Sequence, residues 1–375
     1  MNKLYFPSLN GVRFIAVFIV IKSHVYRICE HIGVKTSNRE IASFIPGKMG
    51  VILFFVLSGF LITYLLLKEE ELTGTIGIKD FYKRRILRIW PLYFFIVIIS
   101  FFLLPKIGFF FYPELTNLVN QSIGNKLVLF CVFLPNLAGI IYSVVPYASQ
   151  LWSVGVEEQF YFFWPFLMKK SKNKLVPMLA IILFYIIVQL FILPLLTKHY
   201  SGNGLINIMI EFWESFNINC MAIGGVFAYL LYKNSVLLKY LFSSLAQILS
   251  LLILILLFSF RIHIPGLQYE IYSILFGVLI LNLSSNPKPL FSLENKFFNY
   301  VGKISYGMYM YHAIAVVIGV KLLDKLGCNL FLIQLALSLL ITVVISGLSY
   351  KYLESRFIKM KLKFSKIISG DNVNG

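Results

Sequence analysis

The feature that most constrains this chain is a series of apolar runs, each close to the length of a membrane-spanning helix. Of the 375 residues, 59% are hydrophobic and 13% are charged, which is far from the usage of a soluble domain. Crossing the hydrocarbon core of a bilayer takes about 20 apolar residues. The sequence therefore predicts an all-α, polytopic membrane helix bundle with about ten transmembrane helices. The ten segments are 8–28, 48–67, 89–105, 151–168, 175–196, 218–232, 240–259, 269–284, 304–322 and 330–352.

The predicted bundle takes up most of the chain. We expect a membrane domain over residues 1–356 and a cytoplasmic tail, basic and then polar, over 357–375. A further apolar run, 127–141, is interrupted by Pro135 and Asn136. A broken run of this kind is tolerated at membrane depth only where protein or water covers its backbone. The sequence leaves open whether this run spans the bilayer, re-enters it or lies at its surface.

Cysteine usage argues against a metal centre. Cys29, Cys131, Cys220 and Cys328 stand singly, with no C-x-x-C pair and no companion histidine at ligand spacing. Zinc sites and disulfide frameworks normally show such spacings. We therefore expect no metal, no disulfide framework and no bound cofactor.

The distribution of positive charge predicts the orientation of the bundle. The formal net charge is +18, but the cations cluster in short segments between apolar runs, around 79–88, 169–174 and 351–366. In a ten-span chain these segments fall on one face, which the positive-inside rule assigns to the cytoplasm. We therefore expect both termini to be cytoplasmic in a multi-pass protein of the cytoplasmic (inner) cell membrane. The charge then serves topology, and we expect no nucleic-acid partner.

Two ionisable residues lie within the first apolar run. Arg13 and His24 are separated by about three helical turns, so both side chains project from one helix face, roughly 16 Å apart along the axis. Ionisable residues on an interior helix face are usually functional. The alternative is that each anchors one end of the helix at an interface. From the residues alone, both interpretations stay open.

The second and third runs contribute small and basic residues. Ser58 and Gly59 interrupt the bulky side chains of the second run. Gly59 favours close helix packing, whereas Ser58 offers a hydroxyl to a ligand. Arg84, Arg85 and Arg88 precede the third run, and the three-residue spacing of the last two places them on one face, where guanidinium groups suit a phosphate. The alternative role of this segment is a topological anchor.

Acidic and histidine side chains also occur in later runs. Glu157 and Glu158 lie inside an aromatic segment, and two adjacent acids facing lipid would be costly. At least one must therefore face protein, water or a cation. Tyr309 and His312 are three residues apart in the ninth run. The simplest interpretation of His312 is a buried histidine satisfied by a neighbouring hydroxyl.

Five motifs together resemble the acyltransferase 3 family of membrane O-acyltransferases. In chain order they are the Arg-x10-His pair, FFVLSGF, FYKRRILRIWPLY, LWSVGVEEQFYFFWP and ISYGMYMYH. The resemblance extends from about residue 4 to about residue 355. It implies a ten-helix enzyme that takes an acyl group, usually acetyl from cytoplasmic acetyl-CoA, and delivers it to a hydroxyl of an extracytoplasmic or lipid-linked glycan, as in surface polysaccharide O-acetylation.

The resemblance carries over residue by residue. The matching positions are Arg13, His24, Ser58, Gly59, Arg85, Arg88 and Glu157. Three positions depart from the family pattern. Where the family often has Asp-Gly-Leu-Arg, this chain has Asn10 and Val12 in place of the Asp and the Leu, and Ile52 stands where the family often has Asp. The missing acid at position 52 weakens any mechanism in which that acid orients the histidine.

These residues combine into one hypothesis. We expect His24 to be catalytic, either taking a proton from the acceptor hydroxyl or carrying the acyl group itself. Glu157 would hold the imidazole in its working tautomer. Phosphates of acetyl-CoA would be bound by Arg84, Arg85 and Arg88.

The rest of the predicted site would line an acyl passage through the bilayer. Its expected residues are Arg13, Ser58, Gly59, Tyr309 and His312. The expected partners of the protein are acetyl-CoA, a glycan or lipid-linked sugar acceptor, and the lipid bilayer. The alternative hypotheses are a transporter of a glycan or lipid-linked intermediate without acyl transfer, and a structural membrane subunit.

Overall fold

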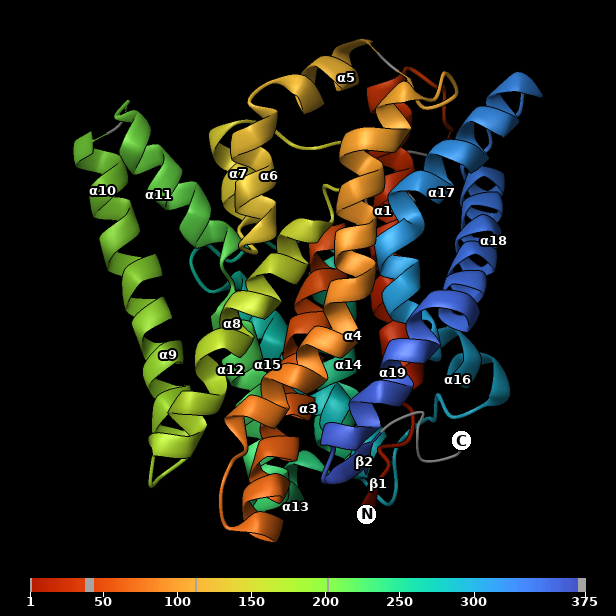
Figure 1. The fold of residues 1–375 in the computed structure, drawn as a ribbon. Helices are drawn as coiled ribbons and strands as arrows, with labels where there is room; N and C mark the ends of the chain where they lie inside the picture. The colour runs from red at the N-terminus through yellow and green to blue at the C-terminus, as the bar shows by residue number, and fades with distance from the viewer. Residues whose placement is uncertain (1, 38–43, 112, 201, 370–375) are drawn as a thin grey trace.

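The computed structural model describes residues 2–37, 44–111, 113–200 and 202–369, and these form a bundle of helices (Figure 1). In chain order the elements are β1 (Asn2–Leu4), α1 (Leu9–Ile32), α3 (Gly47–Thr73), α4 (Ile78–Ile98), η1 (Ile99–Leu103), η2 (Leu104–Lys106), α5 (Pro113–Asn120), α6 (Ile123–Cys131), α7 (Pro135–Ile141), α8 (Leu151–Lys170), α9 (Leu175–Ile187), η3 (Val188–Ile192), α10 (Leu193–Tyr200), α11 (Gly204–Ser215), α12 (Ile218–Tyr232), α13 (Leu237–Leu241), α14 (Ser244–Ser259), α15 (Gln268–Ser285), α16 (Lys296–Lys303), α17 (Ser305–Lys325), α18 (Phe331–Ser349), η4 (Tyr350–Glu354), α19 (Ser355–Lys361), η5 (Leu362–Phe364) and β2 (Ile367–Ser369).

The all-α prediction is confirmed, and each of the ten predicted segments lies largely within helix. A helix satisfies its own backbone hydrogen bonds, which is why an apolar run of this length folds as one in lipid. Six helices of the described chain are long and apolar enough to cross a membrane, so this is a multi-pass membrane protein. The count of about ten crossings stays a prediction. The six are Gly47–Thr73, Ile78–Lys106, Leu175–Tyr200, Gly204–Tyr232, Ser305–Lys325 and Phe331–Phe364.

Three local features go beyond the prediction. The third helix begins at Ile78, well before the expected residue 89, because the basic segment is itself helical. The run 127–141 divides into α6 and α7, with Phe133 at a positive φ of 59° in the break. Pro135 opens α7, a position where proline's missing N–H costs nothing. The parallel pair β1–β2, which the sequence did not predict, joins the two ends of the described chain.

The core of the bundle is built around α1. This helix packs against both α3 and α17, and α3 in turn packs closely on α12. Two glycines permit that close approach, since a Cβ at Gly59 would lie 1.9 Å from the carbonyl oxygen of Met221. A Cβ at Gly224 would lie 2.0 Å from the carbonyl oxygen of Val56. Small residues at such crossings are the usual means of helix association in membranes.

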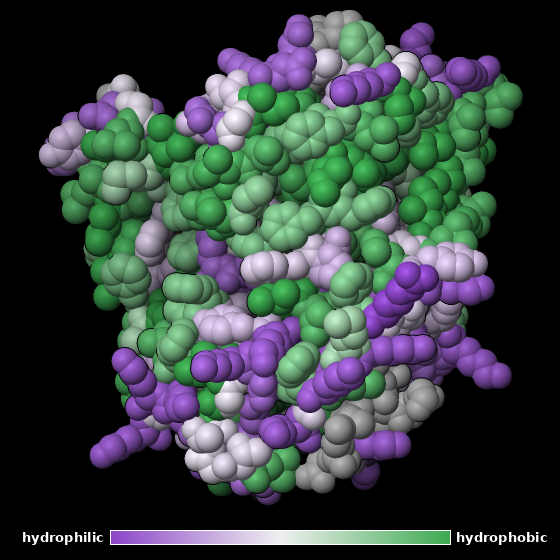
Figure 2. Space-filling view, in the orientation of Figure 1, coloured by the Kyte–Doolittle hydropathy of each residue, from purple (hydrophilic) through white to green (hydrophobic). Residues whose placement is uncertain are grey.

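The two ends of the bundle differ in polarity. Figure 1 places both ends of the described chain, which form β1–β2, together with α13 and α19 at one end, and α5, α10 and the start of α11 at the other. In the same orientation, Figure 2 shows a broad apolar band over the upper part of the molecule, a thin hydrophilic rim above it and a much larger share of hydrophilic side chains toward the end that holds β1–β2. The start of α4 and the α8–α9 connection, which both carry basic residues, lie at that same end (Figure 1).

The close contact at Gly59 gives a stability prediction. Gly59→Ala places a methyl group against backbone that cannot move aside, so we expect a loss of about 1–3 kcal/mol or more in the free energy of unfolding. Thermal unfolding of the purified protein measures it. Gly124→Ala in α6 is the matched control, because a Cβ there meets nothing within 4 Å. Equal melting temperatures for the two variants would contradict the packing argument.

The charge distribution gives a topological prediction. In a background without the four native cysteines, a cysteine replacing Lys172 should resist an impermeant thiol reagent applied to intact cells. A cysteine replacing Lys198 should react. Both positions are exposed, so the contrast reports only the side of the membrane. Reaction of position 172 from outside would reverse the predicted orientation.

Candidate active site

The centre of the site is a pair of histidines from two helices. His24 of α1 and His312 of α17 stack with their ring centroids 4.7 Å apart and their planes within 15°. Nδ1 of His24 and Nε2 of His312 are hydrogen-bonded. His312 is fully buried, whereas His24 lines a large cavity. The packing of α1 on α17 is what brings together two residues far apart in the sequence.

A carbonyl group fixes the protons of this pair. Nδ1 of His312 lies 2.6 Å from the carbonyl oxygen of Tyr309, and a carbonyl can only accept, so this nitrogen carries the proton. In the neutral ring, Nε2 of His312 is then an acceptor, and Nδ1–H of His24 must donate to it. Nε2 of His24 is left with a lone pair. The arrangement therefore supplies an imidazole that can act as a base or a nucleophile.

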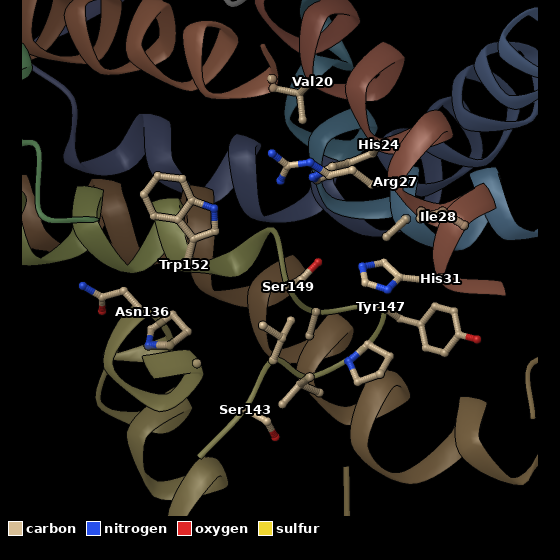
Figure 3. A pocket seen from close by; sticks show the side chains of 18 of the residues that line it. Val20, His24, Arg27, Ile28, His31, Asn136, Ser143, Tyr147, Ser149 and Trp152 are labelled. Carbon is tan, nitrogen blue, oxygen red and sulfur yellow. The ribbon is translucent and has the colours of Figure 1, made fainter. Parts of the chain in front are cut away.

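His24 faces an outer cavity of about 950 Å³. Figure 3 shows Arg27 and His31 projecting from α1 on the same side as His24, with Trp152 and Asn136 across from them. The spacing 24, 27, 31 corresponds to a single helix face, which explains why one helix supplies this whole wall. The cavity offers an aromatic surface, amide and hydroxyl groups, and charges of both signs, since two acids of α11 also line it.

A smaller middle cavity of about 160 Å³ adjoins the outer one through Tyr309 and Val51, which line both. The Tyr309 hydroxyl lies 2.6 Å from Oγ of Ser153 and donates to the carbonyl oxygen of Gln150 at 3.1 Å. The carboxylate of Glu157 also lines this cavity, and the side chains of Ser58 and Tyr161 donate hydrogen bonds to it.

The carboxylate of Glu157 is fully engaged within the middle cavity. Ser58 Oγ donates to Oε1 at 3.1 Å, and the Tyr161 hydroxyl donates to Oε2 at 2.9 Å. The neighbouring Glu158 accepts from the indole of Trp90 at 3.2 Å. Both acids therefore face protein rather than lipid. Glu157 does not bond the imidazole of His24, and the orienting role expected of it is filled by His312.

A third, inner cavity of about 120 Å³ follows the middle cavity toward the end of the bundle that holds β1–β2. It shares Arg13, Arg85 and Arg88 with the middle cavity, and Lys361 of α19 adds a fourth cation. Among the described residues, no acidic side chain lines it. A compact, cationic cavity of this kind is suited to an anion such as a phosphate group.

The arginines of α4 differ in what they contact. Arg84 forms an ion pair with Glu69 at 2.6 Å and does not line the inner cavity. The guanidinium of Arg85 lies 5.8 Å from the ring centroid of Tyr161, and its Nε is buried without a hydrogen-bond partner among the described residues. Arg13 donates to Oδ1 of Asn10 at 2.7 Å, so the amide that stands in place of the family's acid still contacts this arginine.

The predicted site residues thus fall into three groups along one line of cavities. His24, Tyr309 and His312 lie at the outer cavity or beside it, and Ser58 and Glu157 lie in the middle one. The predicted cations Arg13, Arg85 and Arg88 lie at the inner cavity, with Arg84 directed to Glu69. Gly59 packs against α12 and lines none of the three cavities.

The sequence did not indicate several residues that the structure brings to the site. Trp152 and Ser153 belong to the same motif as Glu157, LWSVGVEEQFYFFWP, so their position in the sequence could have indicated that they belong to the site. Arg27 continues the face of Arg13 and His24, which a longer helical-wheel comparison would have shown. Lys361 lies in a basic tail where no local pattern separates it from its neighbours. No cluster of histidine, cysteine or acidic side chains suited to a metal ion occurs in the described ranges.

Comparison with known proteins identifies the family of the chain. Residues 6–351 match the model of the acyltransferase domain Acyl_transf_3. The chain belongs to the acyltransferase 3 family. The resemblance seen in the motifs is thereby confirmed, and Arg13, His24, the α4 arginines and Glu157 all fall inside the matched acyltransferase domain.

Two curated relatives of this acyltransferase domain are proteins of Staphylococcus aureus. "Putative O-acetyltransferase SACOL0978" of strain COL is 28% identical over 380 residues, which cover 96% of this chain and 58% of the relative. "O-acetyltransferase OatA" of strain NCTC 8325 / PS 47 is 26% identical over 385 residues, with the same shares covered. The chain therefore spans a little over half the length of these relatives. No solved structure matches it significantly.

The hydrogen-bond chain from His24 to the Tyr309 carbonyl predicts one tautomer. In protein containing isotope-labelled histidine, NMR should show His24 protonated at Nδ1 and unprotonated at Nε2. His312→Leu removes the acceptor and should mix the tautomers, whereas His312→Gln keeps an oxygen acceptor and should retain more of the Nδ1–H form. Comparison with His24→Gln assigns the signals. A wild-type His24 protonated at Nε2 would contradict the assignment.

Proposed function

We propose that this protein is a membrane O-acyltransferase that moves an acetyl group from cytoplasmic acetyl-CoA to a hydroxyl of an extracytoplasmic or lipid-linked glycan. The observation that carries the proposal is the line of three cavities, which joins a cationic pocket at the end with the termini to His24 at the opposite side of the bundle. Membership of the acyltransferase family and the names of the O-acetyltransferase relatives support it.

The inner and middle cavities suit the acyl donor. Coenzyme A has phosphates at one end and a slender, mostly neutral arm that ends in the thioester. Arg85 and Arg88 present planar donor forks that match phosphate oxygens. The middle cavity then receives the arm, with Glu157 and Tyr309 along it. This order places the thioester next to Tyr309, where the middle and outer cavities meet.

The outer cavity suits the acceptor. Its volume of about 950 Å³ exceeds that of the middle cavity by several-fold, and Trp152 with Asn136 provides the apolar face and amide that a sugar ring requires. A glycan can therefore reach His24 from outside without entering the narrow passage. The same narrowing disfavours the transporter alternative, because the middle cavity of about 160 Å³ is small for a sugar.

The chemical step uses the lone pair on Nε2 of His24. As the acceptor oxygen attacks the thioester carbonyl carbon, Nε2 takes the hydroxyl proton, the carbon–sulfur bond breaks, and the departing thiolate receives the proton. In the covalent alternative, Nε2 attacks the carbonyl carbon and the carbon–sulfur bond breaks to release the thiolate. The acceptor oxygen then attacks the same carbon, the carbon–nitrogen bond breaks, and the hydroxyl proton passes to the thiolate. In both routes His24 gains positive charge, and its Nδ1–H···Nε2 bond to His312 stabilises that charge.

The orientation follows from the charge distribution. The end of the bundle that holds β1–β2 also holds the basic start of α4 and the basic α8–α9 connection, so the positive-inside rule assigns it to the cytoplasm, where acetyl-CoA is available. The outer cavity then opens toward the extracytoplasmic side of the inner membrane. Donor and acceptor approach His24 from opposite sides of the bilayer.

The role of His24 gives a direct kinetic prediction. His24→Ala and His24→Gln should insert normally and lose acetyl transfer, by a factor of about 10² to 10⁴ for a lost general base. Acetylation of envelope glycans, measured by mass spectrometry, is the readout. His199→Gln is the control, since this exposed histidine of α10 lies outside all three cavities. Wild-type transfer by His24→Gln would show that the residue is a structural anchor.

A further inference from the structure

The C-terminal helix α19 contributes a cation to the inner cavity. Lys361 is the last residue of α19, and α19 packs against α4, the helix that carries Arg85 and Arg88 (Figure 1). The side chain of Lys361 is partly buried and lines the cavity together with these arginines and Arg13. Three elements distant in the sequence thus direct positive charge at one small volume.

No acidic side chain of the described residues lines the inner cavity, although Glu157 and Glu158 interact electrostatically with Arg85 from outside it. Lys361 interacts electrostatically with the arginines, which share its sign. Neither Lys361 nor Arg85 nor Arg88 forms an ion pair among the described residues. Glu354 of η4 lies near Arg88, but it does not line the cavity, and its Oε1 accepts a hydrogen bond from Ser349 at 3.2 Å.

A second observation also indicates a missing anion. The Nε of Arg85 is buried and has no hydrogen-bond partner among the described residues. Buried polar groups of native proteins are almost always satisfied, and a buried cation is costly unless it is paired. A donor without an acceptor, beside a cavity that is lined by several cations and, among the described residues, by no acid, is the arrangement expected of a binding site for an anion with several oxygens.

We propose that Lys361 binds a phosphate group of the acyl donor, so that α19 forms part of the donor site. The proposal rests on the proposed function insofar as the donor is a coenzyme A thioester. Arginine forks and the lysine ammonium have complementary roles, because a guanidinium fixes the orientation of a phosphate whereas an ammonium adds a compact charge. Residues of the basic tail outside the cavity, such as Lys359, are then topological only.

Because Lys361 and the arginines carry like charges, a role in donor binding predicts a different effect of substitution from a purely structural role. Without donor, Lys361 repels the arginines, so Lys361→Gln should leave the melting temperature of the donor-free protein unchanged or raise it. The same substitution should weaken donor binding. A lysine that merely supported the fold would lower the melting temperature when replaced. Function and stability therefore change in opposite directions at this position.

The experiment compares Lys361→Gln, Lys361→Arg and Lys359→Gln in the full chain, purified in lipid nanodiscs. The probes are acetyl-CoA and S-acetylpantetheine, which lacks the nucleotide phosphates. We expect Lys361→Gln to raise the Kd for acetyl-CoA about 10- to 100-fold, as for the loss of a charge-assisted hydrogen bond, and to leave binding of S-acetylpantetheine unchanged. Lys361→Arg should retain most of the affinity. The exposed Lys359, on the same helix, should be replaceable without effect on either Kd.

Three results would overturn the assignment of Lys361. They are wild-type affinity of Lys361→Gln for acetyl-CoA, equal loss of affinity for both probes, and a clear fall in the donor-free melting temperature. A different result concerns the proposed function. If the wild-type protein itself does not bind acetyl-CoA, the donor hypothesis fails, whereas binding by the wild type with no effect at Lys361 rejects only the role of α19.

Discussion

The site depends on one hydrogen-bond chain, in which His24 donates to His312 and His312 donates to the carbonyl oxygen of Tyr309. The carbonyl cannot donate, so it determines where both imidazole protons lie. In the proposed mechanism, the remaining lone pair on Nε2 of His24 is the reactive group. Its position requires α1 to pack on α17 and on α3, and α3 to approach α12 closely at Gly59.

The cluster of cations and the His24 imidazole line different cavities of the bundle. The inner cavity concentrates cations, the middle cavity is narrow and has an engaged carboxylate, and the outer cavity is wide, with an aromatic wall. In the proposed function, the phosphates and the slender arm of the donor occupy the first two cavities and a sugar occupies the third. Such an arrangement would keep the two substrates on opposite sides and let only the acyl group pass between them.

The sequence predicted the helices well because the bilayer requires long apolar segments whose backbones bond internally. It also predicted that Arg13 and His24 share one helix face and that Arg85 and Arg88 share another, because each pair lies within a single helix. It could not assign His312 as the partner of His24, because 288 positions separate the two residues. Tertiary packing likewise decided that Glu157 bonds Ser58 and that Lys361 joins the arginines, relations for which local spacing carries no signal.

The most direct test of transfer across the bilayer uses membrane vesicles of known sidedness. Radiolabelled acetyl-CoA is supplied to inverted vesicles, which expose the cytoplasmic face, and to intact right-side-out vesicles from the same cells. The account predicts that label enters glycan or lipid-linked sugar only in the inverted vesicles, and that right-side-out vesicles incorporate it only after permeabilisation. Equal incorporation by both kinds of intact vesicle, or none in either when the protein is present, would contradict it.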